Sequence, residues 1–144
     1  MAGDERPETP ATPASPSQRI LVVEDNTDSR EMLRQLLEID GYEVYDAPDG
    51  QAAIALARKV RPHIALIDLG LPDLNGYELA IRLRGEPQLK GMALIALTGY
   101  GAPEDRQRSR DAGFWSHLVK PIDPDMLRDV FAEVSRARGP SPDG

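Results

Sequence analysis

The sequence predicts an α/β fold in which five parallel strands form one doubly wound sheet with helices on both faces. Short apolar segments rich in β-branched residues alternate with segments whose apolar residues recur at helical spacing, so strand and helix should alternate five times. The strand segments are continuously apolar, and such strands are buried on both faces of a parallel sheet that helices cover. Right-handed crossovers between the strands then give the doubly wound arrangement.

The predicted strands are short, and the first, third and fourth contain an uninterrupted apolar run: RILVVE, HIALID and MALIALT. The second and fifth are less apolar. In chain order the predicted strands are residues 19–24, 43–45, 63–68, 92–98 and 116–120.

Five helices are predicted between and after these strands. Asp28 or Thr27 can cap the first helix, Gly41 ends it, and Pro103 and Pro124 suit first-turn positions of the last two. The segment 103–112 is nearly all polar, so its helical pattern is the weakest. The other four carry apolar stripes: Met32, Leu33, Leu36 and Leu37; Ala53, Ile54, Leu56 and Ala57; Tyr77, Leu79, Ala80 and Leu83; and Met126, Leu127, Val130, Phe131 and Val134.

A chain of 144 residues fits one domain, since domains usually contain roughly 100–200 residues. Residues 1–17 contain four of the 13 prolines and no large apolar residue after Met1. Residues 139–144 are also polar and Pro-containing. Such segments bury too little apolar surface to become ordered, so we expect disordered tails at 1–17 and 139–144 and a folded domain at 18–138.

Composition excludes several classes of function. A net charge of −7 without a basic run disfavours direct nucleic-acid binding. The absence of cysteine excludes disulfides, thiol catalysis and Cys-ligated metals. No apolar run approaches the ~20 residues that span a bilayer, and no signal peptide follows Met1. We therefore expect a soluble, cytoplasmic protein with no membrane insertion.

Polar side chains stand at the carboxyl ends of four predicted strands. They are Glu24 and Asp25 after the first strand, Asp68 at the end of the third, Thr98 at the end of the fourth and Lys120 at the end of the fifth. Ligands of doubly wound sheets bind at this edge, where the strand ends meet. Three carboxylates, a hydroxyl and an ammonium group should therefore converge there.

The loop at 24–28 is acidic at three of its five positions, so it repels a bare phosphate and attracts a hard cation. Nucleotide-binding loops carry glycines or hydroxyls here instead. Carboxylates suit Mg²⁺, which prefers oxygen ligands and keeps waters that a substrate phosphate can replace. Glu24, Asp25 and Asp68 would balance the charges of Mg²⁺ and Lys120. The site is thus suited to phosphoryl transfer with a carboxylate nucleophile.

Four stretches carry a resemblance to a known family: ILVVEDN (20–26), LIDLGLPDLNGYEL (66–79), ALTGYG (96–101) and AGFWSHLVKPID (112–123). In their order, spacing and strand context, the chain resembles the receiver domain of two-component response regulators over residues 19–136. The segments DLGLPDLNGYEL and HLVKPID are most similar to those of receivers attached to hybrid histidine kinases. The resemblance implies a flavodoxin-like (βα)5 fold with strand order 2-1-3-4-5.

The resemblance also implies the chemistry of the site. Asp68 would accept a phosphoryl group from a phosphohistidine on a sensor histidine kinase or a histidine phosphotransfer protein. Asp25 would bind Mg²⁺ directly and Glu24 directly or through water, while Asp68 and the backbone carbonyl of Gly70 complete the metal ligands. Thr98 and Lys120 would hold the phosphoryl oxygens.

Thr98 and His117 would form the conformational switch, although the family usually has Tyr or Phe where His117 stands. The bond between Lys120 and Pro121 is usually cis in the family. Gly70 and Tyr100 occupy positions that tune phosphoryl lifetime in receivers. The fourth helix, fifth strand and fifth helix form the output surface of the family.

The predicted function is that of a phosphoacceptor in a two-component phosphorelay. We expect no output domain, so the output would be contact with an unknown downstream protein or phosphate relay. A phosphorylation-dependent homodimer stays open, as does the choice between a stand-alone regulator and a fragment of a hybrid kinase. We expect the domain to catalyse only its own phosphorylation and dephosphorylation, and not to be an enzyme otherwise.

Two other classes of function compete with this prediction. One is a Mg²⁺-dependent phosphohydrolase with an Asp nucleophile, which typically has a second Asp where Gly70 stands, to act as general acid. The other is a non-phosphorylated pseudo-receiver scaffold. Its usual sign is the loss of the acceptor, the acidic pair or the lysine, and this chain has all of them.

Overall fold

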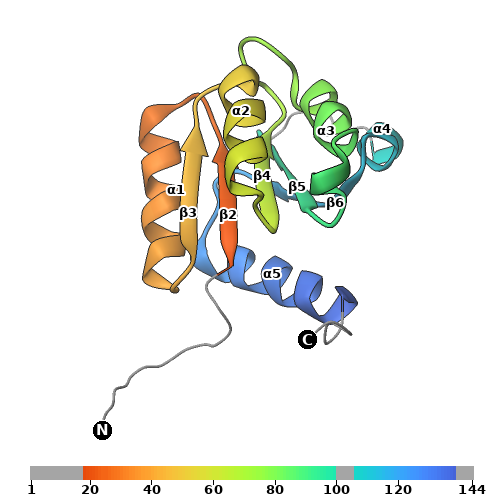
Figure 1. Cartoon of the computed structure of the whole chain (residues 1–144). Helices are drawn as coiled ribbons and strands as arrows, with labels where there is room; N and C mark the ends of the chain where they lie inside the picture. The colour runs from red at the N-terminus through yellow and green to blue at the C-terminus, as the bar shows by residue number, and fades with distance from the viewer. Residues whose placement is uncertain (1–17, 100–105, 139–144) are drawn as a thin grey trace, which may run out of the picture.

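The computed structural model describes residues 18–99 and 106–138. Its five strands form one parallel sheet in the order β3-β2-β4-β5-β6, which confirms the predicted order 2-1-3-4-5 (Figure 1). The strands are β2 Arg19–Val23, β3 Glu43–Ala47, β4 Ile64–Asp68, β5 Ala93–Thr98 and β6 Phe114–Val119.

Helices cover both faces of the sheet (Figure 1). They are α1 Thr27–Ile39, α2 Gly50–Val60, α3 Gly76–Arg84, α4 Arg106–Ala112 and α5 Pro124–Arg138, together with the short 3₁₀ helix η2 Pro87–Leu89, which the sequence did not predict. Apolar residues of α1 and α5 form one core with the sheet, and those of α2, α3 and α4 form a second core on the other face. The doubly wound prediction is thus confirmed.

The continuous apolar runs are explained by this two-sided burial. Within β2, Ile20 and Val22 belong to the core beneath α1 and α5, whereas Leu21 and Val23 belong to the core beneath α2 and α3. All five residues of β4 are buried. The edge strand β3 is only partly buried, in agreement with its less apolar sequence.

Several element boundaries differ from the predicted ones. Strand β6 begins at Phe114, two residues early, because Phe114 pairs with Leu94 ahead of an irregularity in the register between Leu94 and Ile95. The prediction that Asp28 or Thr27 caps the first helix was wrong. Asn26 is the cap, and its Oδ1 accepts a hydrogen bond of 2.8 Å from the backbone N–H of Ser29.

Other predicted helix signals agree with the structure. Gly41 follows the end of α1 with a φ of +93°, a conformation that glycine adopts without strain. Pro124 is the first residue of α5. The predicted helix at 103–112 is described from Arg106 onward, and Pro103 lies outside the described residues. In the described part of the chain, every helix is too short or too polar to cross a membrane.

Candidate functional site

The three predicted carboxylates meet at the carboxyl edge of the sheet. One carboxylate oxygen from each of Glu24, Asp25 and Asp68 lies within 4.8 Å of the others. Glu24 is 1% exposed and Asp68 is 8% exposed, whereas Asp25 is open to solvent. Two of the three carboxylates are therefore buried, and the third faces solvent.

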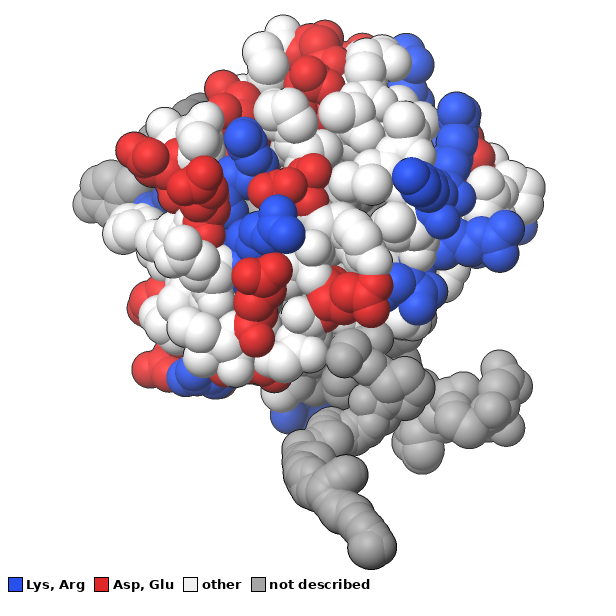
Figure 2. Space-filling view, turned by 60° about the vertical axis from the view of Figure 1, so that its left-hand side comes forward, with Lys and Arg blue, Asp and Glu red and all other residues white. Residues whose placement is uncertain are grey.

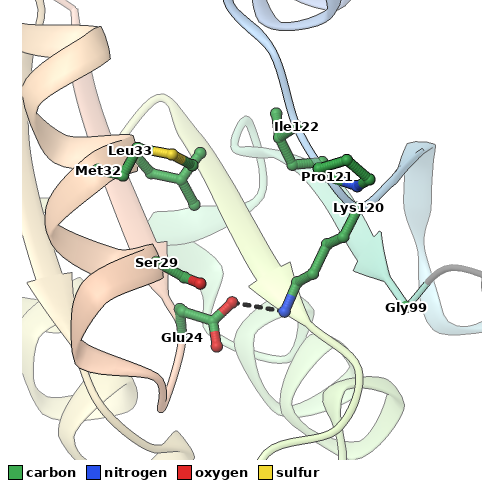
Figure 3. A pocket seen from close by; sticks show the side chains of 8 residues that line it. All are labelled: Glu24, Ser29, Met32, Leu33, Gly99, Lys120, Pro121 and Ile122. Atoms are coloured by element: carbon green, nitrogen blue, oxygen red, sulfur yellow. Dashed lines mark hydrogen bonds and ion pairs between the residues drawn. The ribbon is translucent and has the colours of Figure 1, made fainter.

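Lys120 extends toward both buried acids from the end of β6. Its Nζ lies 2.6 Å from Glu24 Oε1, the contact drawn in Figure 3, and 3.3 Å from Asp68 Oδ2. The backbone N–H of Lys120 donates to the carbonyl of Thr98 at 2.8 Å, which fixes the start of the side chain beside β5. The Lys120–Pro121 peptide bond is cis, as the resemblance implies.

The ionisation of this pair follows from burial and charge. Burial raises the pKa of Glu24 above its usual value, although hydrogen bonds from Lys120 and from the backbone of Asn26 act in the opposite direction. For Lys120, burial favours the neutral amine, but the hydrogen bond to Glu24 and the charge of Asp68 outweigh it, and the pKa lies above its usual value. Lys120 is thus a charged ammonium group. The ionised form of the neighbouring Glu24 carboxylate is favoured by nearby cations.

The loop that carries Glu24 and Asp25 is held by the residues next to it in the fold. The Glu24 backbone N–H donates to the Ala47 carbonyl at 3.1 Å, and the Asn26 N–H donates to Glu24 Oε2 at 3.0 Å. Asn26 then caps α1, which begins one residue later. One short turn therefore joins the end of β2, the acidic pair and the start of α1.

The loop after β4, which begins at Asp68, is equally tight. The Gly70 N–H donates to Asp68 Oδ1 at 3.0 Å, which fixes the carboxylate, and the Gly76 N–H donates to the Leu69 carbonyl at 3.0 Å. A Cβ on Gly76 would lie 2.7 Å from Leu69 Cα and 2.9 Å from the Asp68 carbonyl oxygen. Only glycine allows α3 to begin this close to Asp68, a requirement that was not predicted and that Asn-Gly before a helix could have signalled.

Thr98 lies on β5, the neighbour of β4, and His117 lies on β6, one strand further from Asp68. The Thr98 side chain is buried, and its hydroxyl donates a long 3.4 Å hydrogen bond to the Leu118 carbonyl. His117 is half-buried and pairs with Ala96 across the sheet. A Cβ on Gly70 would meet Asp68 Oδ1 at 3.8 Å, an ordinary van der Waals distance. Tyr100 lies outside the described residues.

A groove of about 530 Å³ opens beside this site, between the start of α1 and the segment that follows β6 (Figure 3). Glu24 and Lys120 belong to both the groove and the acidic site. Most of its remaining wall is apolar. Its lining residues are Glu24, Ser29, Met32, Leu33, Gly99, Lys120, Pro121 and Ile122.

Comparison with known proteins decides the family. The family model of the response regulator receiver domain matches residues 20–132, most of the chain. The chain belongs to this family. The receiver is 34% identical over 103 residues to the polar-differentiation response regulator DivK of Brucella anthropi, covering 72% of this chain and 84% of DivK. It is 40% identical over 112 residues to an uncharacterised 14.6 kDa protein of Leptolyngbya boryana, covering 77% and 86%.

Solved receiver structures have the same fold. The chemotaxis response regulator CheY4 of Vibrio cholerae superposes with a TM-score of 0.78 at 32% identity, covering 83% of this chain and all of CheY4. The signal receiver domain of a histidine kinase from Syntrophus aciditrophicus superposes with a TM-score of 0.75 at 29% identity, covering 87% and 96%. The protein is thus a receiver domain of two-component signalling, a class that is generally non-enzymatic.

The acidic site of this receiver fits a Mg²⁺ ion. Its donors are carboxylate oxygens, which Mg²⁺ prefers, and one of them faces solvent, where the ion can keep waters. Like charges this close repel each other, and the single charge of Lys120 does not balance three carboxylates. The donor set and the charge balance both favour a divalent cation.

Proposed function

We propose that this receiver accepts a phosphoryl group on Asp68 and uses it to change a surface that binds other proteins. The donor is a phosphohistidine on a sensor histidine kinase or a histidine phosphotransfer protein. The observation that carries the proposal is the position of Asp68, whose carboxylate ends β4 within reach of Lys120 and shares an acidic cluster with Glu24 and Asp25. Receiver domains bind Mg²⁺ at such a pocket and interact with histidine kinases or phosphotransfer proteins.

The geometry prepares Asp68 for this reaction. An oxygen of Asp68 attacks phosphorus, so that an O–P bond forms while the N–P bond to histidine breaks and the imidazole takes up a proton. The Gly70 N–H holds Oδ1, and Lys120 lies near Oδ2, where its charge can stabilise the transferred oxygens. Glu24, Asp25, Asp68 and the Gly70 carbonyl would hold Mg²⁺. When bound, the ion supplies positive charge that offsets the phosphoryl oxygens.

Thr98 is the residue that would report phosphorylation. Among the residues that the structure describes, its hydroxyl makes only a long hydrogen bond to the Leu118 carbonyl, so little is lost when it turns toward a phosphoryl oxygen. His117 would follow the movement on β6. The same strand exposes Trp115 and Val119, which lie beside the α4 and α5 surface that a downstream protein would bind.

The groove beside Lys120 supports a protein as phosphoryl donor. It is continuous with the acceptor site through Glu24 and Lys120, and its apolar wall includes Met32, which is 43% exposed on α1. A helix that carries a phosphohistidine could place apolar side chains in this groove while the phosphoryl group reaches Asp68.

Intact mass after incubation with acetyl phosphate and Mg²⁺ tests the proposal. We expect the addition of one phosphoryl group, which is absent in Asp68→Asn and in the presence of EDTA. Phosphorylation that persists in Asp68→Asn would contradict the assignment of the acceptor. Failure both to gain the group and to bind beryllofluoride would identify a pseudo-receiver. Steady release of phosphate from added monoesters would instead support a phosphohydrolase.

A further inference from the structure

We infer that Arg30 is a positioning residue for Mg²⁺ binding, an inference that rests on the proposed function. Arg30 lies in the first turns of α1, and its Nη1 donates a 2.9 Å hydrogen bond to the backbone carbonyl of Glu24. The side chain is only 17% exposed, so it turns inward beneath the acidic loop. A charged donor on a carbonyl makes one of the stronger hydrogen bonds in proteins.

This contact holds the Glu24 backbone on a second side. Its N–H already donates to the Ala47 carbonyl at the end of β3, and its C=O accepts from Arg30. The Nε of Arg30 lies 3.6 Å from Asp46 Oδ2, also on β3. Arg30 therefore ties the acidic loop to α1 and to the neighbouring strand.

The peptide that Arg30 holds is the one that leads to Asp25. Within the described ranges, the Asp25 carboxylate has no hydrogen bond or ion pair of its own. The backbone therefore decides which positions the carboxylate can reach, and the orientation of the peptide before it decides whether those positions include the side next to Glu24 and Asp68. Groups that orient metal ligands in this way control affinity without touching the ion.

The charge of Arg30 would oppose a cation if it stood alone. Asp46 compensates this charge, and it also pairs with Arg34 Nη1 at 3.6 Å. Acidic and basic side chains lie next to one another across the face formed by α1 and β3, as Figure 2 shows. Arg30 can thus hold the carbonyl while adding little net positive charge to the site.

Arg34 provides a matched control. It lies one turn later on α1 and pairs with the same Asp46 and with Glu38, and in the described part of the chain it forms no hydrogen bond or ion pair with Glu24. Arg30→Gln and Arg34→Gln remove the same charge, but only the first removes the hydrogen bond to the loop. Loss of a nearby positive charge should by itself tighten Mg²⁺ binding. A positioning role predicts the opposite sign for Arg30→Gln.

Isothermal titration calorimetry with Mg²⁺ on the full chain tests the inference. We expect Arg30→Gln to weaken binding by about tenfold or more, while Arg34→Gln keeps or slightly improves it. Arg30→Lys should lie between Arg30→Gln and wild type, since one ammonium group cannot serve both partners. Phosphorylation by acetyl phosphate should need more Mg²⁺ in Arg30→Gln but reach the wild-type rate at saturation.

Wild-type or tighter Mg²⁺ affinity in folded Arg30→Gln would overturn the inference, and so would an equal loss in Arg34→Gln. Thermal unfolding without Mg²⁺ shows whether the variants are folded. If Arg30→Gln is not folded, Arg30→Lys decides: weaker binding supports the inference and unchanged binding refutes it. If the wild-type chain itself does not bind Mg²⁺, the proposed function fails rather than the role of Arg30.

Discussion

Asp25 is the exposed member of an acidic cluster whose other two carboxylates are buried. Because the cluster exists only in the folded chain, Mg²⁺ should raise the melting temperature by mass action, with roughly 2.7 kcal/mol gained at about 100 times Kd. Asp25→Asn removes one of three ligand carboxylates, so we expect it to abolish most of this gain. Differential scanning calorimetry with and without Mg²⁺ measures the effect.

Asp28→Asn is the matched control for this prediction. It removes the same charge from an exposed residue in the first turn of α1, outside the cluster. The rise in its melting temperature on adding Mg²⁺ should remain close to that of the wild-type chain. A gain in Asp25→Asn as large as in Asp28→Asn would mean that the ion binds elsewhere.

Residues of the site could be predicted from the sequence where they stand at the end of a strand. Glu24, Asp68 and Lys120 are of this kind, because the parallel sheet brings strand ends together whatever the loops do. Arg30 could not be predicted, since an arginine in a first helical turn resembles any surface arginine until the fold places it beside the Glu24 carbonyl. Its role depends on a tertiary contact.

Among the elements, α2 begins with a cap that comes from another loop. The Gly50 N–H donates to Asp73 Oδ1 at 2.8 Å and the Gln51 N–H donates to Oδ2 at 3.0 Å, in addition to the local cap Asp49. Asp73 lies in the loop between Asp68 and α3. It therefore couples this loop to α2.

We expect Asp73→Asn to destabilise the domain by about 1 kcal/mol, the usual magnitude for a lost cap. The hydrogen bond from Gly50 lowers the pKa of Asp73 below its usual 3.8. The carboxylate therefore stabilises the fold fully above 3.8, and its contribution is lost as pH falls through the lower folded value. Urea unfolding should show a difference between Asp73→Asn and wild type that is constant down to about pH 3.8 and then disappears.

Asp129→Asn serves as control for Asp73→Asn, because Asp129 is exposed in the middle of α5. It should change stability little at any pH. Equal effects of the two substitutions, or a difference from wild type that persists in strong acid, would contradict the capping role.

The connection between α4 and β6 depends on a glycine. Gly113 has a φ of +105°, and a Cβ there would lie 1.9 Å from Arg84 Cδ. The Arg84 side chain is exposed and can move away, but the left-handed backbone still costs an L-residue about 1–2 kcal/mol. We expect Gly113→Ala to destabilise the domain by at least this amount in chemical denaturation.

Gly85 provides the comparison within the same fold. It ends α3 with a helical φ of −72°, and a Cβ there would meet its nearest atom at 3.4 Å. Gly85→Ala should be neutral or slightly stabilising, because alanine restricts the unfolded chain. If both alanine variants lose the same stability, backbone conformation is not what Gly113 supplies.

Helices and strands could be predicted well where burial determines their apolar pattern. Their ends could be predicted less well where local hydrogen bonds determine them. Strands β2, β4 and β5 match their predicted positions to within one residue, since two-sided burial requires apolar residues throughout. The cap of α1 was assigned wrongly because Asn26, Thr27 and Asp28 can all accept a hydrogen bond from a helix start. Which one does so depends on the turn that Glu24 makes with β3.

For the whole molecule, continuously apolar strands and right-handed crossovers were enough to predict the layers, and the resemblance to receiver domains supplied the strand order. It did not predict the groove beside Lys120. The groove forms between α1 and the segment after β6, which are about 90 residues apart in the chain, and residues of an apolar stripe do not reveal which of them stay uncovered. Met32 belongs to the predicted stripe of α1 yet remains 43% exposed.

Because Met32 is exposed, docking of a protein donor can be tested separately from phosphoryl transfer to Asp68. Met32→Ser removes apolar surface from the groove without touching the carboxylates or Lys120. Transfer from a histidine phosphotransfer protein phosphorylated on its histidine should slow by about tenfold, the effect of a residue central to an interface. Phosphorylation by acetyl phosphate, which needs no docking surface, should stay at the wild-type rate.

Ile39→Ser makes the same kind of change at the far end of α1, where Ile39 is 79% exposed, and should affect neither reaction. Autoradiography of the receiver after mixing with the labelled donor gives the first rate, and intact mass gives the second. Equal slowing with both donors would place Met32 in the acceptor chemistry, and no slowing with the protein donor would move the docking surface elsewhere. A loss confined to the protein donor would show that α1 and the segment after β6 act together as one recognition surface, although neither forms the groove alone.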